Sequence, residues 1–239
     1  MSFAVIGYGY WGPNIVRNLI SKKCKVRYVV DIDENRCKIV KNEYPQINHF
    51  ISEPDNGIYN AMNKGIALSS GRYCIFMNSG DTFIDENVLK DLLPKLDGKY
   101  PMVFGVSVNP GGKEHCAIPD VKLRNFWGIS FPHQASFIAR ALFEKYGKYR
   151  EDYRCASDIF FFYEMVFREK IPYLATDRKV CLYEGGGLSG GKIARREWRH
   201  YALHHMGFPD NVYCLLLDYY SVVREQFFPN FSCNRKAVS

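Results

Sequence analysis

Short apolar runs alternate with helix-like segments of about a dozen residues in the first half of the chain, and this alternation restricts the fold more than any other feature. Apolar runs at 3–6, 26–30 and 73–77 are separated by segments whose apolar residues recur at helical spacing. The same patterns predict a helix over 58–68 and a short strand over 102–108. Strands joined through helices form right-handed crossovers and tend to pair in parallel. The sequence therefore predicts an α/β fold with one mixed, mainly parallel sheet and helices on both faces.

Two polar loops, residues 7–12 and 78–81, follow apolar runs, and ligands of parallel sheets gather at the carboxyl ends of the strands. The first loop is the G-x-G-x-x-G pattern of Gly7, Gly9 and Gly12, and Asp31 ends the next apolar run. Such glycines let a diphosphate approach the backbone at a helix N-terminus, and the acid binds a ribose hydroxyl. We expect a nucleotide-related role here, with a plain tight turn as the alternative.

Composition excludes several other classes of protein. No run approaches the roughly 18 apolar residues of a membrane helix, and the first twenty residues lack a signal-peptide pattern, so we expect a cytoplasmic protein. The eight cysteines are scattered without a C-x-x-C pair, which indicates neither a zinc site nor a disulfide framework. The net charge of +7 favours phosphate-bearing ligands without requiring nucleic acid, and we expect no nucleic-acid partner.

The chain contains no internal repeat and no low-complexity linker. We therefore expect one α/β domain over residues 1–205. Apolar residues cluster again at 215–223, which predicts a C-terminal helical tail over 206–239.

The opening of the chain resembles one known family. Residues 3–33, and especially GYGYWGPNIVRN at 7–18, are similar to the NAD(P)-binding start of Gfo/Idh/MocA-type sugar dehydrogenases. The Glu-Lys-Pro motif that supplies the catalytic lysine of that family is not recognisable in this sequence. The resemblance thus implies NAD(P) only under an alternative hypothesis, in which the chain is a non-catalytic nucleotide-binding fusion or an oxidoreductase fragment.

From about residue 49 the sequence resembles a different family, the family 2 glycosyltransferases of the GT-A, Rossmann-like fold. The motifs, in order, are SEPDNGIYNAMNKG at 52–65, GRYCIFMNSGD at 71–81, PHQASF at 132–137, LFEKYG at 142–147, YRCASD at 153–158 and GGLS at 186–189. The resemblance covers about residues 49–190. It implies an inverting enzyme that moves a sugar from a nucleotide-diphospho-sugar to a hydroxyl acceptor, in polysaccharide or cell-surface glycan synthesis.

Asp81 is the expected metal ligand. It occupies the last position of a segment that resembles the Asp-x-Asp element of the family, with Asn78 and Gly80 at places where acids often stand. A leaving diphosphate needs a hard cation, and Mg²⁺ or Mn²⁺ prefers carboxylate and phosphate oxygens. The structural alternative makes Asp81 the N-cap of the polar turn that follows.

Asp158 is the expected catalytic base, because it matches the aspartate that the family uses to deprotonate the acceptor hydroxyl. An aspartate at a helix entrance is also a common cap, and this is the structural alternative. The resemblance implies further contacts. On the donor side these are Asp31, Asp55, Asn63, Asn78, Gly7, Gly9 and Gly12, and on the acceptor or phosphate side they are His133, Gln134, Gly186, Gly187 and Ser189. His133 and Gln134 could equally form a structural pair.

The two resemblances meet at residues 39–48, because the dehydrogenase-like segment 1–48 replaces the usual start of the transferase. Both families begin with strand, helix, strand, helix, and Asp31 falls where the transferase has its nucleoside-binding aspartate. Either the fused chain folds as one transferase-like domain or its donor pocket is broken. The acceptor would be a glycan or a lipid-linked alcohol, and the basic stretch 192–199 could contact anionic lipid at the inner face of the membrane.

Overall fold

The computed structural model describes residues 2–6, 12–21, 23, 25–30, 34–45, 47, 49–51, 53–78, 80–119, 121–123, 131–183 and 192–227. Several residues proposed above for the site lie outside this part: Gly7, Gly9, Asp31, Gly186, Gly187 and Ser189. By compactness the chain divides into two units, Met1–Ala194 and Arg195–Ser239. The division falls earlier than the end of the 1–205 domain proposed from the sequence.

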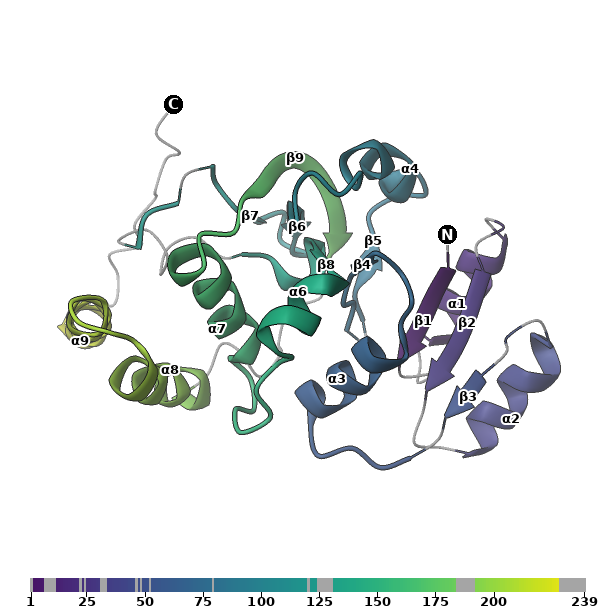
Figure 1. Cartoon of the computed structure of the whole chain (residues 1–239), viewed down its shortest axis with the longest axis horizontal. Helices are drawn as coiled ribbons and strands as arrows, with labels where there is room; N and C mark the ends of the chain where they lie inside the picture. Colours follow the sequence, from purple (N-terminus) through teal and green to yellow (C-terminus); the bar gives the residue numbers. More distant parts are fainter. Residues whose placement is uncertain are drawn as a thin grey trace. The chain divides into compact units, whose positions relative to one another are not determined.

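The first unit opens with a three-stranded parallel sheet. Its strands are β1 (Ser2–Ile6), β2 (Lys25–Val30) and β3 (His49–Ile51), with β2 in the centre, and helices α1 (Gly12–Ser21) and α2 (Glu34–Glu43) connect them (Figure 1). Val26 and Val29 of β2 are both buried, in one hydrophobic cluster with Val16 of α1 and Val40 of α2. The strand and its two connecting helices therefore share one core.

The remaining described strands of this unit form a second sheet. They are β4 (Tyr73–Cys74), β5 (Thr82–Phe83), β6 (Met102–Val108), β7 (Glu114–Cys116), β8 (Ser136–Ala139) and β9 (Tyr173–Leu182), in the order β4-β8-β6-β9-β5 with β7 also on β6. Within the described strands β6 and β9 pair in parallel, and the other pairs of this sheet are antiparallel.

The α/β class and the mixed pairing predicted from the sequence are confirmed. The expected predominance of parallel pairs holds for the first sheet and not for the second. One physical reason is the tight connection between β6 and β7, where Asn109 Oδ1 accepts the Lys113 N–H and Gly112 has a φ of 77°. Strands joined by so short a turn can only run antiparallel.

Further helices and short helical turns complete the first unit. They are α3 (Ile58–Leu68), α4 (Val88–Leu92), η1 (Leu93–Lys95), η2 (His133–Ala135), α6 (Arg140–Tyr146), α7 (Ser157–Tyr163) and the π-helical turn η3 (Glu164–Arg168). The structure confirms the predicted helix over 58–68 and the predicted strand over 102–108. The predicted strand over 73–77 is shorter, because its ladder with β8 covers Tyr73 and Cys74.

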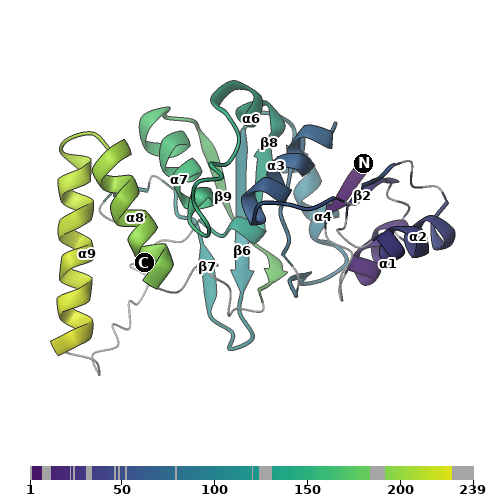
Figure 2. The ribbon, with the colours of Figure 1, turned by 90° about the horizontal axis from the view of Figure 1, so that it is seen from below.

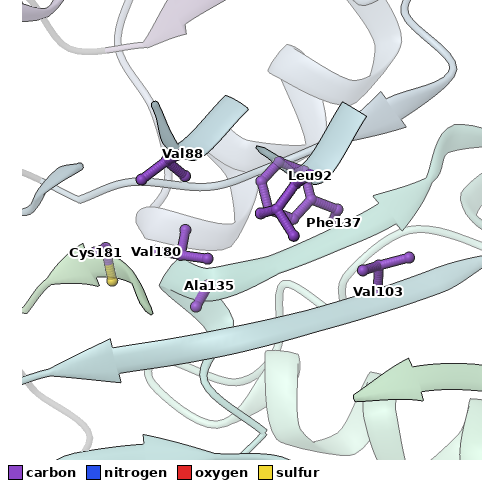
Figure 3. Packing of buried hydrophobic residues seen from close by; sticks show 7 residues of the cluster. All are labelled: Val88, Leu92, Val103, Ala135, Phe137, Val180 and Cys181. Carbon is purple, nitrogen blue, oxygen red and sulfur yellow. The ribbon is translucent and has the colours of Figure 1, made fainter. Parts of the chain in front are cut away.

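Strand β6 is buried on both faces, and this fixes the layers of the second sheet. On one face, side chains from α4, β6, η2, β8 and β9 pack together; they are Val88, Leu92, Val103, Ala135, Phe137, Val180 and Cys181 (Figure 3). On the other face Phe104 contacts Phe162 of α7 edge-on, with ring centroids 5.3 Å apart. Helices therefore lie on both faces, as predicted.

The second unit contains α9 (Asp210–Phe227) and most of α8 (Lys192–His205), which lie side by side in both views (Figures 1 and 2). Asp218 of α9 is buried and pairs with Arg199 at 2.5 Å and Arg195 at 3.6 Å, both from α8. Trp198 and Cys214 are buried within the same unit. Among the helices in the described part of the chain, none combines the length and apolarity that crossing a bilayer would require.

Candidate active site

Asp158 lies in the first turn of α7, and neighbours from two other elements fix its carboxylate. Helix α7 starts at Ala156 without a side-chain cap, so the capping role considered from the sequence is not what holds Asp158. Its Oδ1 accepts the Tyr59 hydroxyl at 2.7 Å, and its Oδ2 lies 3.9 Å from His133 Nδ1. The side chain remains 25% exposed. A carboxylate that is oriented and still open to solvent can take a proton from a bound molecule.

His133 lies behind this carboxylate, in the core. Its ring is stacked on Phe76, with centroids 5.2 Å apart and an interplanar angle of 11°, and its Nε2 is 3.0 Å from the Tyr149 hydroxyl. Burial lowers the pKa of His133, and the nearby Asp158 charge opposes this only in part. The imidazole is therefore neutral near pH 7 and contacts Asp158 from the protein side.

Two tyrosine hydroxyls complete this group. Burial is the main cause that raises the pKa of Tyr59 and of Tyr149, and the charge of Asp158 adds to it in both. Both hydroxyls therefore keep their protons and act as donors. The Tyr149 hydroxyl lies 3.0 Å from His133 Nε2, and the other ring nitrogen, Nδ1, faces Asp158.

Asn63 ties α3 to the segment that precedes α7. Its Nδ2 donates to the Tyr149 carbonyl and to Glu151 Oε1, both at 2.8 Å, and its Oδ1 accepts the Tyr149 N–H at 3.0 Å. Both N–H donors of this amide are thus engaged by the protein. Asp55 is exposed, and its Oδ1 accepts the Gly57 N–H at 3.0 Å in the turn that starts α3. The donor contacts expected of Asn63 and Asp55 stay predictions.

Asp81 ends a tight turn at the edge of the second sheet. Its Oδ2 accepts the Asn78 N–H at 3.1 Å, and its own N–H donates to the Asn78 carbonyl at the same distance. The carboxylate therefore bonds backward to the turn, and this bond is not the forward N-cap considered from the sequence. The Asp81 side chain is only 2% exposed. Burial raises the pKa of Cys181 on β9 to about 12, with the charge of Asp81 as a second cause.

A short segment that contains Phe76 and ends at Asp81 relates the two acids to each other. Near its start Phe76 stacks on His133, which faces Asp158, and at its end stands Asp81. Gln134 is half-buried beside His133 on η2, and Gly12 begins α1. The structure thus brings Asp158, His133 and Gln134 to one end of the segment and Asn78 and Asp81 to the other.

Sequence reasoning missed Tyr59 and Tyr149 as members of the site. Tyr59 is 99 positions from the aspartate it contacts, and Tyr149 is 16 positions from His133. Neither tyrosine belongs to a local pattern that indicates its partner. One signal could have pointed to Tyr59: it lies in the first turn of α3, just after the loop that contains Asp55, which the sequence predicts to contact the donor.

The donor set at Asp81 bears on metal binding. No group of three histidine, cysteine, aspartate or glutamate side chains able to hold a metal occurs in the part of the chain that the structure describes. A cation at Asp81 would then be held by one protein carboxylate together with oxygens of a bound diphosphate. This matches the way in which Mg²⁺ is usually bound, through one or two carboxylates plus substrate phosphates.

Curated relatives match part of the chain. An uncharacterized glycosyltransferase of Mycobacterium tuberculosis is 37% identical over 121 residues, which are 48% of this chain and 46% of that protein. A PGL/p-HBAD biosynthesis glycosyltransferase of Mycobacterium bovis is 29% identical over 122 residues, 44% of this chain and 42% of that protein. The matched residues thus span less than half the length of these relatives.

Solved structures and a family profile extend the match. S. aureus TarS, residues 1–349, has a TM-score of 0.63 at 17% identity, covering 98% of this chain and 75% of that one. The same protein in complex with UDP-GlcNAc has a TM-score of 0.60 at 16% identity, covering 95% and 73%. At these identities the likeness concerns the fold, which is GT-A-like. The profile named Glycosyl transferase family 2 matches residues 16–165, well over half of the chain, and the chain therefore belongs to glycosyltransferase family 2.

Proposed function

We propose that this chain is an inverting glycosyltransferase that moves a sugar from a nucleotide-diphospho-sugar to a hydroxyl acceptor in cell-surface glycan synthesis. The observation that carries the proposal is Asp158: it lies in the region matched by the family, one of its oxygens is held by Tyr59, and its side chain is open to solvent. The name of the M. bovis relative, a glycosyltransferase of PGL/p-HBAD biosynthesis, supports the class of product.

The proposed reaction is a single displacement. The acceptor hydroxyl loses its proton to the Asp158 carboxylate while its oxygen bonds to the anomeric carbon of the donor sugar. The bond between that carbon and the diphosphate oxygen breaks, and the electron pair leaves with the nucleoside diphosphate. The configuration of the anomeric carbon inverts because the attacking and leaving oxygens lie on opposite sides of it.

We further propose that Asp81 holds Mg²⁺ or Mn²⁺ together with the diphosphate. Enzymes of this family generally depend on a divalent cation. The oxygen donor set described above fits a hard cation, which would neutralise charge on the leaving diphosphate. The chain's own contribution is the Asn78–Asp81 turn, which fixes the carboxylate beside β5.

The parallel sheet β1-β2-β3 supports a nucleotide site at the carboxyl ends of β1 and β2. We propose that residues 1–48, which resemble a dehydrogenase opening, form the nucleoside half of the donor site, with Asp31 and the glycines at 7, 9 and 12 as contacts. TarS was solved with UDP and with UDP-GlcNAc, which favours a uridine nucleotide as the first donor to test. The same sheet favours the second candidate, a protein that binds NAD without transferring sugar.

On the acceptor side we propose Gln134 with the loop residues Gly186, Gly187 and Ser189 as contacts to a glycan or lipid-linked alcohol. A lipid-linked acceptor would bring the chain to a membrane surface. The exposed Arg196 of α8 could then meet anionic headgroups.

Two measurements test the proposed function. A thermal-shift panel compares UDP, GDP and NADH, each with and without Mn²⁺, because a ligand that binds the native state alone raises its stability. We expect a Mn²⁺-dependent shift with UDP or GDP that is lost in Asp81→Ala. Release of nucleoside diphosphate from UDP- and GDP-sugars in the presence of simple glycoside acceptors should be abolished by Asp158→Asn. Stabilisation by NADH alone would favour the second candidate.

A further inference from the structure

The two oxygens of the Asp158 carboxylate have different surroundings. Oδ1 accepts a 2.7 Å hydrogen bond from Tyr59, whereas Oδ2 faces His133 Nδ1 across 3.9 Å, which is too long for a hydrogen bond. The Asp158 carboxylate accepts no other hydrogen bond within the described residues. One oxygen is thus engaged by a hydrogen bond of the protein, and the other accepts none within the described residues.

Tyr59 is well placed to keep Oδ1 of Asp158 in one position. Its side chain is 5% exposed, and burial keeps the hydroxyl protonated, so that it can only donate to the charged carboxylate. The helix that carries it is fastened to the segment before α7 by the three hydrogen bonds of Asn63. The ring of Tyr59 also packs against Tyr149, with centroids 5.5 Å apart. The position of the hydroxyl is therefore set by packing on several sides.

We propose that Tyr59 is a positioning residue that assigns the two oxygens their roles: Oδ1 is the anchored atom and Oδ2 is the atom that receives the acceptor proton. This inference rests on the proposed role of Asp158 as the base. Tyr59 fixes the rotation of the carboxylate about its bond to Cβ, which aims Oδ2. Without the hydroxyl the carboxylate rotates more freely, and Oδ2 points at the acceptor hydroxyl in a smaller fraction of the bound complexes.

The test compares Tyr59→Phe with a matched control, Tyr73→Phe. Tyr73 is also partly buried, and its hydroxyl donates at 2.7 Å to the Tyr100 carbonyl, away from Asp158. The assay is nucleoside diphosphate release by the full chain from UDP- and GDP-sugars with glycoside acceptors. We expect Tyr59→Phe to lower kcat by roughly 10-fold or more while the KM for the donor stays near the wild-type value. Tyr73→Phe should leave both constants unchanged.

The outcomes separate the inference from the proposed function. Wild-type activity in Asp158→Asn would refute the base itself. An inactive Asp158→Asn beside a Tyr59→Phe variant with unchanged kcat, or with a changed KM alone, would overturn the inference and leave the base in place.

A second measurement does not depend on knowing the donor. In thermal unfolding of Tyr59→Phe, Asp158→Ala and the double variant, we expect the loss in the double variant to fall short of the sum of the single losses, because both changes break the same bond. Strictly additive losses would overturn the inference.

Discussion

Substitution of Gly105 by alanine should destabilise the second sheet more than any surface change. Gly105 lies in β6 opposite β9, and a Cβ built on it would stand 2.2 Å from Val180 Cγ2 and 2.8 Å from the Arg178 carbonyl oxygen. Neither neighbour can withdraw easily, because Val180 is fully buried and the carbonyl belongs to a backbone paired with β6. The strand has room for glycine alone at this position.

The magnitude follows from two opposing terms. Forcing an extra methyl group into a packed core costs about 1–3 kcal/mol and occasionally more. Alanine in place of glycine returns about 0.5–1 kcal/mol through the entropy of the unfolded chain. With a backbone atom among the two close contacts we take the upper end of the cost, so Gly105→Ala should lower the free energy of unfolding by about 2–2.5 kcal/mol.

A double-mutant cycle with Val180→Ala tests this reasoning. Val180→Ala alone removes buried methyl groups and should cost about 2 kcal/mol. In the double variant the Val180 contact disappears while the Arg178 carbonyl contact remains, so the combined loss should fall short of the sum by about 1–2 kcal/mol. Urea unfolding followed by circular dichroism gives these values. A Gly105→Ala variant within about 0.5 kcal/mol of wild type, or strict additivity, would refute the packing argument.

Three further predictions concern a histidine, an asparagine and two cysteines. Burial lowers the pKa of His133, so the stability that the neutral imidazole contributes is fully present above about pH 6.5 and is lost as the pH falls through the folded-state pKa. In thermal melts, His133→Gln should therefore lose less stability than wild type between about pH 7 and pH 5. Asn63→Leu breaks three hydrogen bonds and should lower the free energy of unfolding in urea by about 2–3 kcal/mol. A loss below about 1 kcal/mol would show that Asn63 does not fasten α3 to the segment before α7. In thiol titration of the native chain Cys116→Ser should remove a rapidly reacting thiol, whereas Cys181→Ser should not.

Local patterns predicted the elements well, because each is set by residues close in sequence. The helix over 58–68 and the strand over 102–108 could be read from apolar spacing and from the Gly57 and Pro101 that precede them. Strand direction in the second sheet could not, because a period of two residues looks the same in parallel and antiparallel strands. A short turn such as that at Gly111 and Gly112 sets the direction of only the two strands that it joins.

The candidate site also has a part that local sequence could predict and a part that it could not. Motifs identified Asp81 and Asp158, since the family resemblance marks single positions along the chain. The contacts that give these acids their surroundings depend on packing between distant segments, as for Tyr59 and Asp158. His133 shows the difference: its sequence context placed it at the acceptor or phosphate side, and the structure places its ring between Phe76 and Tyr149, behind Asp158.

Aromatic rings lie behind Asp158, the proposed base, and restrict where its proton can go. From Oδ2 the inward path leads across 3.9 Å to the buried His133 imidazole and ends at the Tyr149 hydroxyl, among Phe76, Phe143 and Phe161. A proton cannot leave through such a dead end. Under the proposed mechanism the base is therefore reset only from its solvent side, after the glycosylated product has moved away.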